Sequence, residues 1–298
     1  MKKTALFLPL SILSASVLLV GCGGGGGSSV KSAGAAPATL ITSNPASFDA
    51  VTNEVDYTAL GPVATSAVDR GISQTSRTDL TYNSSGDLTK LVVTTPGSTV
   101  TWDSTSGDTQ TPVPGFSDHI VLSDAANSYD MLVVDTDFDY QAFGVWRTGN
   151  GTAAGVIGGL SFGLKTASVP VTGNATFTGQ LVGTYINAIG QGNFVKGAVS
   201  INSDFAARSL AFSTSGTSTI NPSSGATSAI SSLDMTGTLT YGAGANAFSG
   251  GVSTAGTGLT GTASGAFYGP NAAEIGGVFN VKAASGVEFY SGSFGAKQ

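Results

Sequence analysis

The chain has 298 residues, of which 43 are glycine and 10% are charged, against usual shares of about 7% and 25% in soluble domains. One cysteine and one histidine exclude a disulfide-stapled scaffold and a Cys/His metal cluster. Twelve basic residues against 18 acidic ones, a net charge of −6, exclude a surface built to neutralise the phosphates of a nucleic acid.

The N-terminus has the pattern of a secretory signal. Two lysines precede an apolar run from Ala5 to Val20, which at 1.5 Å per residue is about 24 Å long, too short for the roughly 30 Å hydrocarbon layer of a membrane. Residues 1–21 are therefore predicted to be a signal peptide. The run ends in Leu-Val-Gly followed by Cys22, which resembles the lipobox of bacterial lipoproteins. This resemblance implies cleavage before Cys22, which would carry diacylglycerol on its thiol and a fatty acid such as palmitate on its amine.

Residues 22–39 are predicted to be a flexible tether. Five consecutive glycines follow Cys22, and small residues continue through Ala38, so this segment has almost no side chain to bury. Gly23 stands where an Asp retains lipoproteins in the inner membrane. By resemblance to that sorting rule, we expect the protein in the outer membrane, lipid-anchored through Cys22 and facing the cell exterior.

Residues 40–150 are predicted to form a β subdomain. Apolar and polar residues alternate between clusters of Gly, Asn, Asp and Ser, which is the pattern of half-buried strands. Two such runs lie between Asp79 and Trp102, with turns at residues 83–86 and 96–97. One longer strand is expected from Met131 to Trp146.

Residues 151–298 are predicted to form an eight-stranded antiparallel β-barrel, so the fold class is all-β. Charges become rare beyond Gly149, and short strand patterns recur at near-regular spacing, as in closed barrels and sandwiches. Glycines inside the strands permit the sharp coiling that a small barrel needs. Closure also removes the sheet edges that a chain so poor in lysine leaves unprotected. The expected strands are residues 174–186, 193–202, 204–213, 229–240, 246–254, 258–268, 274–282 and 286–295.

One segment near the C-terminus carries a specific resemblance. Residues 265–279 read Gly-Ala-Phe-Tyr-Gly-Pro-Asn-Ala-Ala-Glu-Ile-Gly-Gly-Val-Phe, which is similar to the signature of the transferrin-binding-protein-B-like β-barrel surface lipoproteins of Gram-negative bacteria. Residues 143–147, 173–179 and 199–205 resemble further strands of that family. The resemblance implies a handle-like β subdomain before the barrel, and the chain has the length of one lobe, as in the single-lobe, Slam-dependent members. The motif residues are Gly265, Phe267, Tyr268, Gly269, Pro270, Asn271, Glu274, Gly276, Gly277 and Phe279.

The motif indicates structure rather than catalysis. Gly269-Pro270-Asn271 has the residue types of a tight turn. The pair Gly276-Gly277 inside a strand pattern indicates a bulge or a close approach of another backbone. Glu274 is expected to cap unpaired amides of the turn.

The family resemblance implies a function in binding and no enzymatic activity. We expect a surface-exposed module that captures a host serum protein, such as an iron or haem carrier, for nutrient acquisition, with a TonB-dependent outer-membrane receptor as a partner and no cofactor. Two alternatives stay open. Some members of the family bind host complement regulators, and a barrel of this size can hold haem or another apolar ligand inside, as lipocalins do.

Reactive side chains are few, and each has a structural interpretation. His119 is predicted to be an exposed loop histidine, with an axial haem ligand as the alternative. Its neighbour Asp118 is not expected to orient it, because adjacent residues of an extended segment point to opposite faces. Asp135, Asp137 and Asp139 have the spacing of the first ligands of a calcium loop but lack its later Gly and Glu. A solvated strand face, and no metal site, is therefore expected.

Overall fold

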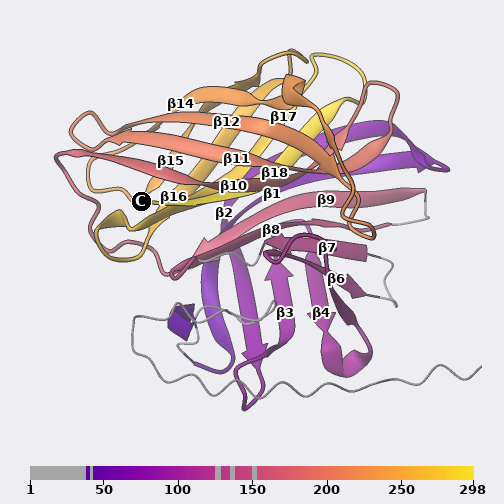
Figure 1. The fold of residues 1–298 in the computed structure, drawn as a ribbon, viewed down its shortest axis with the longest axis horizontal. Coiled ribbons are helices and arrows are strands. Elements are labelled where there is room, and N and C mark those ends of the chain that lie inside the picture. Colours follow the sequence, from indigo (N-terminus) through magenta and orange to yellow (C-terminus); the bar gives the residue numbers. More distant parts are fainter. Residues whose placement is uncertain (1–37, 41–42, 125–128, 135–137, 150–152) are drawn as a thin grey trace, which may run out of the picture. The chain divides into compact units, whose positions relative to one another are not determined.

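The computed structural model describes residues 38–40, 43–124, 129–134, 138–149 and 153–298. The predicted signal peptide, Cys22 and most of the predicted tether lie outside the described residues. The described chain consists of two nine-stranded antiparallel sheets with a few short 3-10 turns, which confirms the all-β prediction (Figure 1). Within these residues, no helix has the length and apolar character needed to cross a membrane.

The first sheet, called the handle sheet below, runs from residue 46 to residue 163. The chain passes outward through β1 to β4 and returns through β5 to β9, so that β9 pairs with β1 in the middle of the sheet. Trp102 and Trp146 are buried in its core. The strands are β1 (Ala46–Leu60), β2 (Val63–Tyr82), β3 (Leu88–Thr94), β4 (Thr99–Asp103), β5 (Thr109–Pro112), β6 (His119–Asp124), β7 (Tyr129–Val134), β8 (Gln141–Arg147) and β9 (Ala154–Gly163).

The single long strand expected from Met131 to Trp146 is wrong. The two ends of that segment are cross-strand partners, because Met131 of β7 lies opposite Trp146 of β8. β8 has to pair with β7 on one side and β9 on the other, and the chain must reverse between β7 and β8 for this pairing. Phe138 and Tyr140 precede β8 and so share no strand face with Ala142.

The predicted boundary between subdomain and barrel at residue 150 also moves. β9 belongs to the handle sheet, where it pairs with β1 and β8. The glycines of β9 resemble those of the barrel strands in the sequence, but they are required for packing. A Cβ at Gly158 would overlap the ring of Trp146, and one at Gly159 would overlap the backbone of Gly292 in the barrel. The handle sheet therefore ends at Gly163, and the first barrel strand begins at Asn174.

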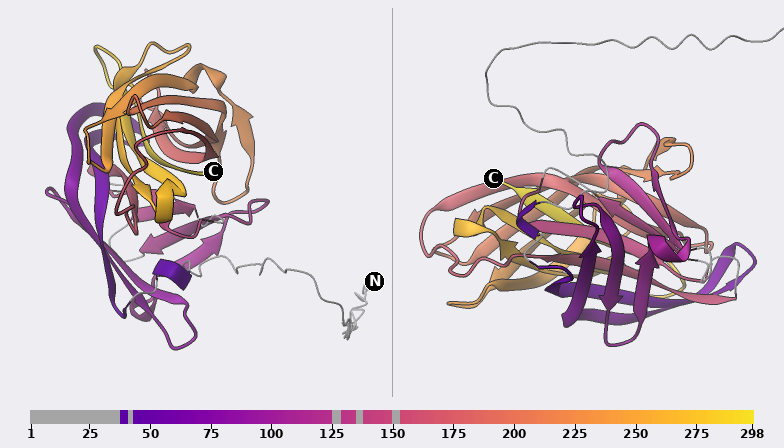
Figure 2. Two further views of the ribbon diagram at one scale, coloured as in Figure 1. Left: turned by 90° about the vertical axis from the view of Figure 1, so that its left-hand side faces the viewer. Right: turned by 90° about the horizontal axis from the view of Figure 1, so that it is seen from below.

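The second sheet closes on itself into the predicted eight-stranded antiparallel barrel. β10 pairs with both β11 and β18, and β11 also pairs with β12, so the ring has no open edge (Figure 2). A ninth short strand, β13, is added to β12 outside the ring. The strands are β10 (Asn174–Ile186), β11 (Gly192–Asp204), β12 (Ser209–Ile220), β13 (Thr227–Ala229), β14 (Met235–Tyr241), β15 (Ala247–Thr254), β16 (Thr260–Tyr268), β17 (Glu274–Lys282) and β18 (Phe289–Lys297).

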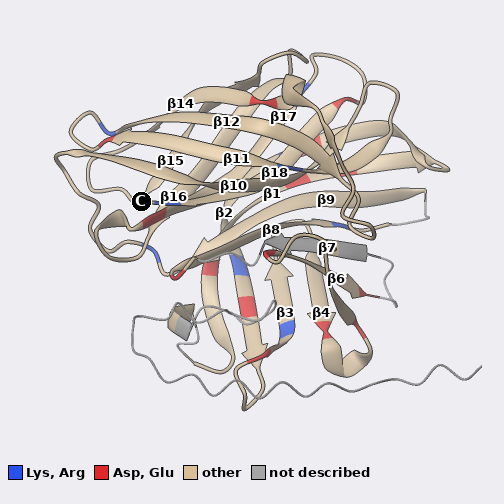
Figure 3. Ribbon diagram, in the orientation of Figure 1, with Lys and Arg blue, Asp and Glu red and all other residues tan. Residues whose placement is uncertain are grey.

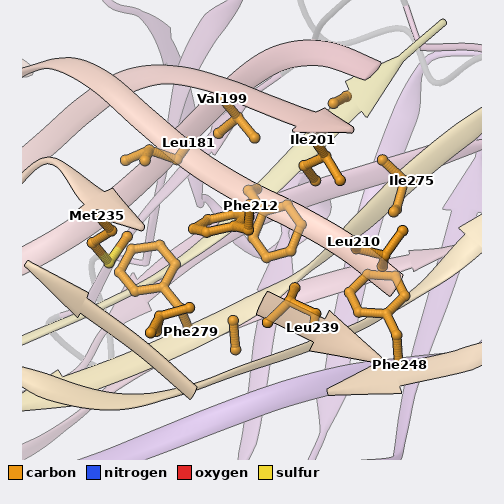
Figure 4. Close-up of a cluster of buried hydrophobic side chains, with 14 of the residues drawn as sticks. Leu181, Val199, Ile201, Leu210, Phe212, Met235, Leu239, Phe248, Ile275 and Phe279 are labelled. Carbon is orange, nitrogen blue, oxygen red and sulfur yellow. The ribbon is translucent and has the colours of Figure 1, made fainter. Parts of the chain in front are cut away.

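Side chains fill the barrel. Alternate residues of the strands point inward, and aromatic rings meet in the centre (Figure 4). The rings of Phe212 and Phe294 are 5.1 Å apart between centroids, and those of Phe279 and Tyr290 are 4.7 Å apart. Aliphatic side chains such as Leu181 and Leu239 occupy the space between the rings. The barrel is thus a packed core that gives the outer surface a rigid support.

Candidate functional site

The motif at residues 265–279 lies where the barrel meets the handle sheet. It covers the second half of β16, the turn after it and the first half of β17, and both sheets belong to the same compact unit of the chain. Phe267 and Phe279 point into the barrel core. The turn follows the expected chemistry, since Gly269 has a φ of 73° and Asn271 one of 56°, values that glycine and asparagine tolerate best.

Glu274 joins the two sheets instead of capping its own turn. Its buried carboxylate accepts hydrogen bonds from the backbone amides of Asp139 (2.6 Å) and Tyr140 (3.1 Å), which lead into β8. Burial raises the pKa of Glu274, and the two amide hydrogen bonds act against that rise. Glu274 therefore caps backbone amides, as expected, but these amides belong to a segment far from its own turn in the sequence.

Polar side chains join the sheets along a line that we call the handle–barrel seam: β8, β9 and β1 on one side, β17 and β18 on the other. Gln141 donates from Nε2 to the carbonyl oxygens of Ile275 (3.0 Å) and Ala296 (3.3 Å). Ser293 donates to the carbonyl of Gly144 at 2.7 Å. Gly276 lies against the Gln141 amide, so closely that a Cβ there would overlap Oε1. The small residues of the motif thus let two backbones approach.

Residues Gly159–Gly163 read Gly-Leu-Ser-Phe-Gly, the spacing of a hydrolase nucleophile elbow. An elbow needs a sharp turn from a strand into a helix, whereas this segment lies within β9. Ser161 is buried, and its hydroxyl is 3.1 Å from the hydroxyl of Tyr268, whose pKa burial raises to about 12. This serine is a seam residue and has no base beside it among the residues that the structure describes.

The prediction that His119 is exposed in a loop is wrong. It begins β6 and is 1% exposed, with the ring of Phe116 5.3 Å away. Its Nδ1 lies 2.7 Å from Oδ1 of Asp118, a contact made possible because Asp118 is in a turn and not in a strand. Nε2 is buried and has no hydrogen-bond partner among the described residues, so iron could reach it only after the surrounding side chains had moved.

The three aspartates considered for calcium do not form a described site. Asp135 and Asp137 lie outside the described residues, and the side chain of Asp139 is exposed. Over the described parts of the chain, no group of three or more His, Cys, Asp or Glu side chains is arranged to hold a metal ion. Charged residues are scattered over the ribbon instead of being gathered on one face (Figure 3).

Two of the clefts between the handle sheet and the barrel in the described part of the chain are lined by Arg147. The first cleft, about 590 Å³, lies between β5, β6 and β8 of the handle sheet and β11, β12 and the loop after β12. The second cleft, about 290 Å³, lies between β1, β8, β9 and β10 near the turn that joins β1 to β2. No Asp or Glu lines either cleft among the described residues. Arg147 at the end of β8 is therefore the charged side chain in the described lining of both clefts.

The rim of the second cleft carries exposed aliphatic side chains. Leu60 at the tip of the β1–β2 hairpin is 79% exposed, and Ile189 in the β10–β11 turn is 68% exposed. The two turns are joined by a hydrogen bond of 2.8 Å from the amide of Ala64 to the carbonyl of Gly190. Large apolar side chains exposed beside a cleft are typical of interaction sites. We call these two turns the hairpin tips. Sequence periodicity does not predict that they lie side by side, because this contact depends on strand pairing between distant parts of the chain.

Comparison with known proteins identifies the barrel. Residues 169–298 match the family model described as the C-lobe and N-lobe beta barrels of Tf-binding protein B. No curated protein matches the sequence.

Similar solved structures include a point mutant of transferrin binding protein B from Haemophilus parasuis. It is 17% identical, with a TM-score of 0.50, over 83% of this chain and 45% of that one. The isotype 1 protein of Neisseria meningitidis is 17% identical over 82% of this chain and 58% of that one, with a TM-score of 0.42. A mutant of transferrin binding protein B from Actinobacillus pleuropneumoniae is 15% identical over 84% of this chain and 99% of that one, with a TM-score of 0.43.

The Haemophilus parasuis structure shows likeness of fold. This chain spans about half the length of the Haemophilus parasuis and Neisseria meningitidis proteins. The family match rests on the barrel, and the handle sheet precedes that barrel in the chain. Residues 169–298 therefore form a β-barrel of the kind found in the lobes of Tf-binding protein B.

Proposed function

We propose that this protein is a non-catalytic binding protein that captures a host serum protein of the transferrin kind. The observation that carries the proposal is the match of residues 169–298 to the barrels of Tf-binding protein B. The similar solved proteins are transferrin binding proteins by name. Capture by equilibrium binding needs a rigid scaffold with variable loops at its surface, and the packed barrel with its attached handle sheet supplies that scaffold.

The capture surface that we propose is the hairpin tips, with Leu60 and Ile189 as apolar anchors. Apolar anchors near the centre of an interface contribute most when the partner removes them from water. Both anchors stand on turns that are fixed to each other through Ala64 and Gly190. Binding would therefore cost little loop ordering, which is one of the main costs of association.

The proposed location is the outer face of the outer membrane. It is supported by the lipobox resemblance at Cys22 and by the glycine-rich residues after it. A lipid anchor and a tether would hold the captured carrier beside a TonB-dependent receptor, which would take up the iron. The variant Cys22→Ser should no longer be found in the membrane fraction. Protease added to intact cells should digest the wild-type protein, because a protein on the outer face is accessible without lysis.

Direct binding tests the capture proposal. The chain without residues 1–22 is passed over immobilised iron-loaded transferrin, iron-free transferrin, haemoglobin and complement regulators. The double variant Leu60→Asp/Ile189→Asp should bind the preferred partner at least roughly tenfold more weakly. Val171→Asp is the matched control, because Val171 is 77% exposed but precedes β10 at the end away from the β10–β11 turn.

The results separate the parts of the proposal. Loss of binding in the double variant alone supports the hairpin tips as the capture surface. Equal binding by wild type and both variants would contradict that surface, and failure of the wild-type chain to bind any of the proteins would contradict capture of a host carrier. Preference for a complement regulator would favour that alternative from the family resemblance.

The lipocalin-like alternative has less support. A ligand inside the barrel needs an internal cavity, and buried aromatic and aliphatic side chains occupy the interior (Figure 4). His119, the residue considered as a haem ligand, belongs to β6 of the handle sheet and not to the barrel wall.

A further inference from the structure

Arg147 differs from the other cations of the handle sheet because the contact of its guanidinium is with an aromatic ring, that of Phe194, and not with a carboxylate. Arg70 pairs with Asp56 at 2.7 Å, Arg77 with Asp79 at 2.8 Å and Lys90 with Asp103 at 3.1 Å. Within the described residues, no carboxylate lies within ion-pair distance of Arg147, and its buried Nε donates to no acceptor.

A guanidinium has five N–H donors, and leaving a buried donor unpaired costs free energy. The fold places the ring of Phe194 beside this charge and Asp130 of β7 opposite it in the strand register, but supplies no acceptor for Nε among the described residues. A ligand in the cleft would supply that acceptor.

The position of Arg147 makes it reachable by a small ligand. It is half-buried and lines both clefts at the point where they adjoin, next to Gly192. The first cleft, at about 590 Å³, falls within the roughly 300–1,000 Å³ that is typical of small-molecule sites. No Asp or Glu appears in either lining among the residues whose side chains are described. In the strand register, Asp130 of β7 lies opposite both Ser123 and Arg147.

The lining of the first cleft selects among anions. Arg147 is a single positive charge, so it balances a carboxylate better than a phosphate monoester with close to two negative charges. The planar fork of a guanidinium also matches the two oxygens of a carboxylate. Around it the cleft offers neutral hydrogen-bonding groups, including the amides of Asn193 and Asn221 and the hydroxyls of Ser223 and Ser228. These groups suit a ligand with several hydroxyl groups.

The ring of Phe194 adds an apolar face to the same cleft. The Cζ atom of Arg147 lies 5.5 Å from the centroid of that ring, a cation–π distance that fixes the guanidinium plane near the aromatic surface. A ligand carboxylate on Arg147 would thus place the rest of the ligand beside Phe194. A sugar ring has apolar C–H faces and polar edges, and it fits this combination.

We propose that the first cleft is a binding site for an acidic sugar, of the sialic acid or uronic acid class, whose carboxylate is held by Arg147. The site is separate from the hairpin tips, so the proposal does not depend on which protein they capture. The sugar could be a free monosaccharide or the terminal residue of a glycan, and the chemistry at Arg147 is the same in both cases.

Calorimetry on the full mature chain tests the proposal with ligands that differ in one feature. N-acetylneuraminic acid and glucuronic acid should bind, whereas the methyl ester of N-acetylneuraminic acid and galactose should bind at least roughly tenfold more weakly, since a charge-assisted hydrogen bond is lost. This comparison uses wild-type protein and does not depend on the folding of a variant. Tighter binding of sialyllactose than of the free acid would identify a glycan terminus as the source, and equal binding would identify the monosaccharide.

Variants then assign the contact to Arg147. Arg147→Gln should weaken binding of the acid at least roughly tenfold. The affinity of Arg147→Lys should lie between those of wild type and Arg147→Gln, because lysine keeps the charge and loses the planar fork of the guanidinium. Arg208→Gln is the matched control, an exposed arginine that lines neither cleft. Equal binding of acid and ester, binding of inorganic phosphate in place of the acids, or full binding by a folded Arg147→Gln protein would each overturn the proposal.

Discussion

Asp118 shows how a single carboxylate connects both sheets. It lies 2.7 Å from Nδ1 of His119, and Nε2 of Gln180 in the barrel donates to its other oxygen at 2.9 Å. Burial raises the pKa of this carboxyl, but the hydrogen bonds from His119 and Gln180 outweigh burial and lower the pKa to about 2. The folded protein therefore favours the ionised form of Asp118.

This lowered pKa predicts an acid-sensitive contribution to stability. Because the folded pKa lies below the ordinary value of 3.8, the contribution is fully present above about pH 5 and is lost as the pH falls towards 2. We expect Asp118→Asn to lower the free energy of unfolding by about 1 kcal/mol at pH 6, a figure reduced for solvent screening because the side chain is 37% exposed. At pH 2 the difference should be much smaller.

Urea unfolding followed by tryptophan fluorescence at both pH values measures the effect of Asp118→Asn. Asp49→Asn, which changes an exposed carboxylate on β1, is the control for removing a surface carboxylate that does not connect the two sheets. If Asp118→Asn lowered the free energy of unfolding by the same amount at pH 6 and at pH 2, the role of ionised Asp118 would be contradicted.

At the scale of elements, local patterns identified most strands of the barrel. The expected segments at residues 174–186 and 274–282 coincide with β10 and β17, and the other six overlap the remaining strands of the ring. Alternation and turn residues are local signals, so they can be read directly from the sequence. The family motif likewise predicted the barrel through its resemblance, and its turn at Gly269 and Asn271 has a local conformational reason, since both residues have a positive φ.

The predictions that proved wrong concern features that depend on residues far away in the sequence. No Gly or Pro marks the reversal between β7 and β8, and its aspartates alternate with other residues as a strand would. The burial of His119 depends on what covers β6. Arg147 gains significance only because β8, β11 and β12 meet around it. Such meetings are set by pairing over long sequence separations, which periodicity does not report.

The handle–barrel seam gives a prediction for the contact between β8 and β17. A Cβ on Gly276 would overlap Oε1 of Gln141, whose amide is held by two hydrogen bonds. We expect Gly276→Ala to destabilise the protein by about 2 kcal/mol, in the range of overpacked sites. Because the two positions touch, Gln141→Ala should restore part of that loss in the double variant.

Thermal and urea unfolding of the single and double variants measure this coupling between Gly276 and Gln141. Gly251→Ala on β15 is the matched control, since the nearest atom to its added Cβ is 3.9 Å away, and its effect should be small. Equal effects at Gly251 and Gly276, or strictly additive effects of Gly276→Ala and Gln141→Ala, would show that the seam is not tightly packed there.

At the scale of the whole molecule, two hydrophobic clusters are shared between the sheets. One combines Phe143 and Val145 of the handle sheet with Val182 and Ile220 of the barrel. The other combines handle residues around Ile157 with Ile186 and Phe289 of the barrel. The outer face of the barrel is therefore apolar where the handle sheet covers it, and removing that cover would expose a contiguous patch.

Cutting the chain after Gly163 tests whether the barrel depends on its cover. A fragment of residues 164–298 keeps every strand of the ring and its packed interior, so it should fold, but it loses the seam hydrogen bonds and exposes Val182, Ile186 and Phe289. We expect a lower midpoint of thermal unfolding than for residues 38–298, together with self-association that light scattering after gel filtration detects. The triple change of these residues to Thr should restore a monomer. A monomeric fragment as stable as the longer chain would show that the handle sheet contributes nothing to the barrel's stability and is present for binding alone.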